Sequence, residues 1–179
     1  MKQESGRFQR ELKSQPGWSL AAARAHAAAI VSRSDPDRAR RDLVELLFSN
    51  DPDIRKRAAD VARRISDHQR EFLYPATAQF AAILADTPLG ESRTRWHLGL
   101  VVARTARSAS EISTAAELLW MLSEDASNVV RCSAVEGLGE LAIRSRAIRA
   151  QAEPYLMRAL TTGTPAMKCR ARGALKRLK

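Results

Sequence analysis

The sequence contains only two cysteines, Cys132 and Cys169, among its 179 residues. Two cysteines are too few for a disulfide framework, and neither belongs to a CxxC pair or to a histidine and cysteine cluster with zinc-site spacing. The three histidines, His26, His68 and His97, are scattered along the chain. We therefore expect two free thiols, no metal site and no cofactor.

Long uncharged apolar runs are also missing. No stretch approaches the roughly 18 residues that a membrane span needs, and the opening "MKQESGRFQR" lacks the apolar core of a signal peptide. We therefore expect no membrane association and a cytoplasmic protein. Alternating β-branched runs are absent as well, whereas 45% of the residues are apolar and 28% are charged. This composition is typical of a folded, all-α protein.

Motifs that carry catalysis are not found either. No glycine-rich phosphate loop follows a strand pattern, and no serine or cysteine nucleophile has a base and an orienting acid at a suggestive spacing. The sequence therefore predicts a protein that is not an enzyme.

Positive charge, in contrast, is plentiful. The formal net charge is +10, and residues 145–179 hold nine lysines and arginines but one acidic residue, Glu153. Such a surplus indicates an acidic partner unless it only keeps the surface soluble. The closing segment "PAMKCRARGALKRLK" is therefore either a nucleic-acid-binding surface or a regular last helix with a polar outer face.

Four segments of the chain align without internal gaps. They are "IRKRAADVARRI" from Ile54, "TRWHLGLVVART" from Thr94, "VRCSAVEGLGEL" from Val130 and "MKCRARGALKRL" from Met167, at spacings of 40, 36 and 37 residues. Small or apolar residues recur at i, i+4, i+7, i+8 and i+11 in each segment, which is the stripe of an amphipathic helix. A periodic unit of this length indicates a repeat architecture.

Each aligned helix follows another apolar run and a turn, so the repeating unit is a helix, a turn and a helix. Proline fits the first turn of a helix, and all seven prolines lie at the proposed junctions: Pro16, Pro36, Pro52, Pro75, Pro88, Pro154 and Pro165. Five helix pairs account for the chain. Four glycines fall inside predicted helices, where close helix packing is the expected reason: Gly99, Gly137, Gly139 and Gly173.

The segments "DPDIRKRAADVA", "NVVRCSAVEGLGELA" and "GTPAMKCRARGALKRL" resemble HEAT repeats, and in particular short bacterial proteins made almost wholly of such repeats. The resemblance covers residues 36–179. It implies a right-handed α-solenoid whose second helices line the concave face. Pro16 lies 36 residues before Pro52, so residues 1–35 are expected to form a degenerate first repeat of a single domain over residues 1–179. It implies binding or scaffolding but no activity. The turn "ADTPLGES" is longer than its counterparts, and "TTGTP" lacks the usual acid.

A basic column, Arg55, Arg95, Arg131 and Lys168, runs beside the apolar stripe of the aligned helices. These side chains could brace the solenoid by bonding turn carboxylates such as Asp51, Asp86 or Asp125, or they could face a phosphate backbone. We favour the bracing role.

Positions opposite the stripe are expected to be exposed on the concave face. There Trp96 and Leu100 form an apolar patch rimmed by charge, which is typical of a protein-binding hot spot. The predicted partner-binding residues are Lys56, Arg63, Trp96, Leu100, Arg104 and Arg170, and they suit an acidic protein partner. The alternative is that Trp96 is buried, because the array curves tightly or because its first repeat folds over. No residue forbids a homodimer that forms through the apolar third repeat.

Nucleic-acid binding is the second hypothesis, because HEAT-like alkylpurine glycosylases show that such a fold can wrap a duplex. The candidate phosphate-binding residues are Arg57, Arg64, Arg95, Arg172, Lys176 and Arg177. Against this hypothesis, Asp60 and Glu136 interrupt the groove, and aromatic residues make up only 5% of the chain.

Overall fold

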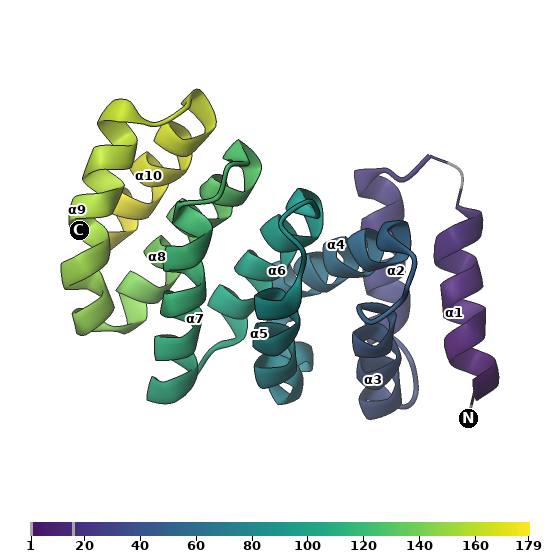
Figure 1. The fold of residues 1–179 in the computed structure, drawn as a ribbon. Coiled ribbons are helices and arrows are strands. Elements are labelled where there is room, and N and C mark those ends of the chain that lie inside the picture. Colours follow the sequence, from purple (N-terminus) through teal and green to yellow (C-terminus); the bar gives the residue numbers. More distant parts are fainter. Residues whose placement is uncertain (1, 16) are drawn as a thin grey trace.

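In the part of the chain that the structure describes, five helix pairs are arranged in one row. The structure is a computed structural model that describes residues 2–15 and 17–179, with side chains from Phe8 onward. Its elements are α1 (Lys2–Ser14), α2 (Leu20–Val31), α3 (Pro36–Leu46), α4 (Pro52–His68), the 3-10 helix η1 (Arg70–Ala76), α5 (Thr77–Asp86), α6 (Ser92–Thr105), α7 (Ala109–Ser123), α8 (Asn128–Arg144), α9 (Arg146–Thr162) and α10 (Pro165–Leu178). Figure 1 shows successive pairs side by side between the two termini. The predicted α-solenoid of five helix pairs is confirmed.

Prolines open three of the helices, as predicted. Pro36, Pro52 and Pro165 each lie in a first turn, where the missing N–H would have had no intrahelical partner. The residue before each proline accepts a backbone N–H through its side-chain oxygen, which caps the helix. Pro16, which was also predicted to lie at a junction, falls outside the described residues.

The junction predicted at Pro154 is wrong. Helix α9 already begins at Arg146, because Ser145 caps it by accepting the N–H of Ile148, and Pro154 lies inside the helix. A proline there removes the hydrogen bond to the carbonyl of Ala150, and both residues are exposed. The carbonyl can therefore bond to solvent, and the local capping signal prevails over the proline.

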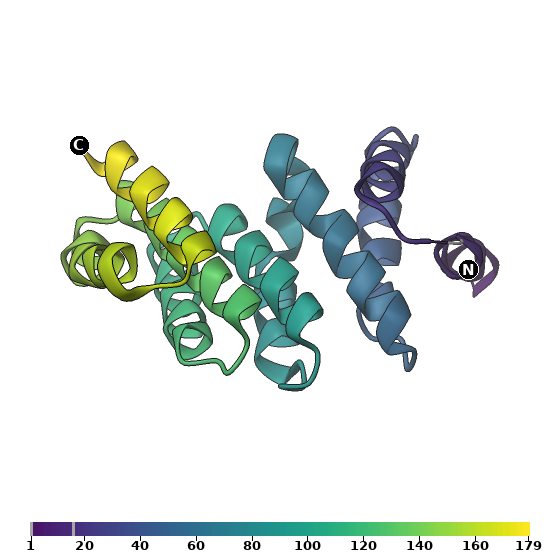
Figure 2. The same ribbon diagram turned by 90° about the horizontal axis from the view of Figure 1, so that it is seen from above.

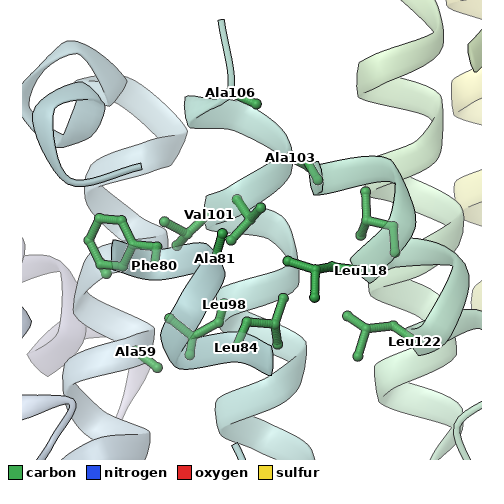
Figure 3. Close-up of a cluster of buried hydrophobic side chains, with 14 of the residues drawn as sticks. Ala59, Phe80, Ala81, Leu84, Leu98, Val101, Ala103, Ala106, Leu118 and Leu122 are labelled. Carbon is green, nitrogen blue, oxygen red and sulfur yellow. The ribbon is translucent and has the colours of Figure 1, made fainter. Parts of the chain in front are cut away.

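The second helices α2, α4, α6, α8 and α10 form one row, which Figure 2 shows from above. Buried apolar side chains of both rows join in one core. Figure 3 shows its centre, where α5, α6 and α7 contribute Phe80, Ala81, Leu84, Leu98, Val101, Ala103, Leu118 and Leu122. Each fully buried leucine or phenylalanine contributes about 1.5–3 kcal/mol to stability. None of the helices in the described ranges is long and apolar enough to cross a membrane.

Glycines allow neighbouring helices to pack closely against the second helices α6 and α8. An added Cβ would lie 2.5 Å from Ala174 at Gly139, and 2.7 Å from a leucine side-chain carbon at Gly99 and at Gly137. The predicted packing role of these three glycines is confirmed. It is wrong for Gly173, where a Cβ would meet no atom within 4 Å.

Candidate functional site

Four second helices are joined across one face by consecutive ion pairs. On α4, Arg64 Nη1 lies 3.5 Å from Asp67 Oδ2, and the other oxygen of Asp67 lies 2.5 Å from Arg104 Nη1 on α6. Arg104 Nη2 lies 2.8 Å from Glu136 Oε1 on α8, and Glu136 Oε2 accepts from Arg170 Nε on α10 at 3.0 Å. We call these five residues the ion-pair chain. Their side chains are only 11–30% exposed, so solvent screens the pairs less than ordinary surface pairs.

The ion-pair chain contains Arg104 and Arg170, two of the residues that the sequence assigned to partner binding. Glu136 brings them together, because one carboxylate accepts from both guanidinium groups. Sequence reasoning missed Asp67. Its signal was the helical spacing, since it follows Arg64 by three residues and so lies on the same side of α4.

Arg63 and Trp96 meet beside the ion-pair chain. The guanidinium carbon of Arg63 lies 5.7 Å from the centroid of the Trp96 ring, which is within cation–π range. Its nearest carboxylate partner is Asp67, at 3.8 Å, and burial lowers the pKa of Arg63. Among the described residues, neither Arg63 Nε nor Trp96 Nε1 has a hydrogen-bond partner. Both atoms are donors only and are buried, so a ligand that approaches this face does not reach them directly.

Trp96 itself lies between the two predicted alternatives. Its side chain is half-buried and packs against the core, and its ring stacks on that of His97 with the centroids 4.4 Å apart. Part of the indole therefore remains accessible beside Arg63.

The expectation that Leu100 lies exposed beside Trp96 is wrong, because Leu100 is 0% exposed. Helix α6 packs against α4 on one side and α8 on the other, as well as against α5 and α7. With neighbours on both flanks, a position opposite the apolar stripe is covered too. Leu100 therefore belongs to the core and cannot contact a partner directly.

Lys56 lies apart from the ion-pair chain. It forms an ion pair with Asp53 at 2.5 Å within the first turns of α4, and the two side chains are 36% and 66% exposed. Exposed pairs of this kind contribute at most about 1 kcal/mol. Lys56 is thus free to exchange partners, but nothing brings it to Trp96.

Three of the six predicted phosphate-binding residues already form hydrogen bonds or ion pairs with other groups of the protein. Arg57 donates to the carbonyls of Leu12 and Gln15 at the end of α1, and Arg64 pairs with Asp60 and Asp67. Arg95 is buried and pairs with Asp125 at 2.9 Å. The expectation that Arg95 could face phosphates is therefore wrong, and its bracing role is confirmed.

The other three predicted phosphate-binding residues, Arg172, Lys176 and Arg177, lie exposed on α10. Arg177 Nη1 pairs with Glu140 Oε1 on α8 at 2.8 Å. The closing segment is the last second helix, as predicted, and its buried residues form one stripe of Met167, Ala171, Ala174 and Leu178.

The basic column braces successive turns with partners that differ from repeat to repeat. Arg55 pairs with Glu91 in the turn of the next helix pair, and not with Asp51 or Asp86. Arg131 donates to the carbonyls of Asp125 and Ala126 in its own turn. Arg55 and Arg95 pair with a carboxylate of the following turn, but the turn that follows Arg131, "TTGTP", has no carboxylate, so Arg131 bonds carbonyl groups instead.

Asp60, which was predicted to be exposed, is instead a buried hub at the N-terminal end of this face. It accepts from Trp18 Nε1 and Arg64 Nε at 3.0 Å each and is 7% exposed. His97 Nδ1 lies 3.8 Å from it, and burial lowers the pKa of His97 to about 4, although Asp60 opposes the shift. His97 is therefore neutral near pH 7 and a weaker base than an ordinary histidine.

Within the described ranges, no group of three or more histidine, cysteine, aspartate or glutamate residues is arranged to hold a metal ion.

No family model matches the chain, and no curated protein matches it.

Several solved structures share the fold. One designed armadillo repeat protein is 21% identical, with a TM-score of 0.60 over 98% of this chain and 84% of its own. Another, solved in complex with the peptide (KR)4, is 19% identical, with a TM-score of 0.59 over 98% of this chain and 83% of its own. Armadillo and HEAT repeats are both helical solenoids, so these similarities support the solenoid fold.

Proposed function

We propose that this protein is a non-catalytic binding scaffold, and that the face carrying the ion-pair chain binds an acidic segment of a protein partner. A similar solenoid binds a peptide, namely the designed armadillo repeat protein in complex with (KR)4. That ligand is basic, whereas the present face carries a surplus of arginine. Charge complementarity therefore favours an acidic ligand here.

The observation that carries the proposal is the shortage of carboxylates in the ion-pair chain. Four arginines in and beside it share three carboxylates: Glu136 pairs with Arg104 and Arg170, Asp67 pairs with Arg64, Arg104 and, at a longer distance, Arg63, and Asp60 pairs with Arg64. An incoming carboxylate gains charge-assisted hydrogen bonds without having to displace every internal pair.

The residues divide into two roles in this proposal. Arg104 is 11% exposed and tied to two carboxylates, so it holds Asp67 and Glu136 in place. Arg170 is 30% exposed and part of the Trp96 ring is accessible, so these two contact the partner, whereas Arg63, which is only 13% exposed, holds the Trp96 ring through its cation–π contact.

The test is fluorescence anisotropy with labelled (Asp-Glu)4 and (Lys-Arg)4 peptides at about 50 mM salt. We expect only the acidic peptide to bind, and Arg170→Gln to weaken it about fivefold, since an exposed ion pair contributes about 1 kcal/mol. Arg146→Gln is the matched control, because Arg146 is an exposed arginine on α9.

Two results contradict the proposal. Equal weakening by Arg170→Gln and Arg146→Gln would mean that only net charge matters. Tighter binding of duplex DNA than of the acidic peptide, with a loss of a thousandfold or more between 50 and 200 mM salt, would indicate a nucleic-acid surface centred on α10.

A further inference from the structure

A cleft of about 500 Å³ lies between the C-terminal halves of α2 and α4. Its volume falls within the roughly 300–1,000 Å³ range of binding pockets. In Figure 2 the C-terminal end of α4 points away from α2. The cleft is lined by Arg24, Ala27, Ala28, Val31, Ser32, Arg64, Ile65, His68 and Gln69.

The lining residues combine an apolar floor with a basic rim. Ala27 and Ile65 are buried, and Val31 is half-buried, so a side chain that enters the cleft meets mainly hydrocarbon. Arg24 and His68 are exposed at its edge. Such a site suits an apolar group with a negative charge close to it.

The charges around the cleft favour a carboxylate. The nearby acids, Asp60 and Asp67, both bond to Arg64, at 3.0 and 3.5 Å. Within the described residues, no carboxylate lies within ion-pair distance of Arg24. An acidic residue of a partner can therefore pair with Arg24 without competing with an internal pair.

The cleft also adjoins the proposed binding face. Arg64 lines it and is the first member of the ion-pair chain, which leads through Asp67 and Arg104 toward α10. A single acidic segment of a partner that binds along the ion-pair chain would place the partner residue next to that segment in the cleft.

We infer that this cleft takes an apolar side chain, of about the size of leucine, that lies next to acidic residues in the partner segment. The inference rests on the proposed function, because the acidic residues bind along the ion-pair chain. The cleft then determines which acidic segments bind, since charge alone does not distinguish them.

The experiment compares two labelled peptides, Leu-(Asp-Glu)3-Leu and Ser-(Asp-Glu)3-Ser, by anisotropy with the full chain. Leucine at both ends allows for either chain direction. We expect the leucine peptide to bind about tenfold tighter, which corresponds to burial of much of one leucine side chain. Ala28→Leu fills the cleft and should remove this advantage without changing the affinity for the serine peptide.

Ala25→Leu is the matched control, because Ala25 is an exposed residue of α2 that does not line the cleft. It should keep the tenfold advantage. Equal binding of the two peptides to the unmodified protein, or an advantage that persists in Ala28→Leu, overturns the inference and leaves the proposed function standing. Failure of both peptides to bind overturns the proposed function and this inference with it.

Discussion

Helices α8 and α10 occupy equivalent places in adjacent repeats, yet their surroundings are opposite. Cys132, Val135 and Gly139 of α8 are buried, whereas their counterparts on α10, 37 residues later, are the exposed Cys169, Arg172 and Lys176. Gly139 faces Ala174 of α10 at a distance that leaves no room for a side chain. In the described chain, no later helix covers the equivalent flank of α10.

This difference explains much of the basic character of the closing segment. The three positions that a neighbouring helix covers carry small or apolar residues, whereas two of their three uncovered counterparts are arginine or lysine. Arg170 is the exception, because it turns toward Glu136 and joins the ion-pair chain.

The largest expected effect concerns the turns. Arg95→Ala should lower the free energy of unfolding by about 3–5 kcal/mol, because it leaves buried Asp125 without its charged partner. Arg131→Ala should cost only about 1 kcal/mol, since the half-exposed Arg131 bonds carbonyls. Urea unfolding of both variants checks this difference. Equal losses would show that the buried ion pair does not brace the turn.

Gly139→Ala should destabilise the protein by about 1–3 kcal/mol. The added methyl group would lie 2.5 Å from Cβ of Ala174, an atom that cannot rotate away. Thermal unfolding followed by circular dichroism measures the effect. The double variant with Ala174→Gly should recover part of the loss, and no recovery would place the strain elsewhere.

Gly173→Ala should act in the opposite direction and stabilise the protein by about 0.5–1 kcal/mol. Its Cβ would meet no atom within 4 Å, and alanine loses less backbone entropy in a helix than glycine. The melting temperature should rise by about 2 °C, as expected for a chain of this size. A fall would indicate that another part of the molecule covers this face.

The smallest effect leaves stability unchanged and concerns the two thiols. Cys169 is exposed, whereas Cys132 is buried and burial raises its pKa. A disulfide reagent at pH 8 should therefore modify Cys169 quickly and Cys132 slowly, because the thiolate is the reactive form. Cys169→Ser should remove the fast phase. Two equally fast thiols would contradict the close packing between α8 and α10.

The sequence predicts only part of the proposed binding face. Arg104 and Arg170 were identified because they are basic residues on predicted inner helices. Leu100 was misplaced because a helical wheel treats one helix as facing a single neighbour, whereas α6 has neighbours on both flanks. The cleft beside Arg24 has no sequence signature, since it depends on the course of α4 relative to α2.

The sequence by itself determined the five helix pairs, because apolar spacing, capping residues and most prolines act within a few residues of chain. It also favoured bonds between the basic column and turn carboxylates, which Arg95 forms with Asp125, but it did not say which residue pairs with which. Only the tertiary structure decided which basic residues stay accessible and which carboxylates they share. Those contacts join helices from different repeats, so they depend on how closely the helices approach, and glycines such as Gly139 set that distance.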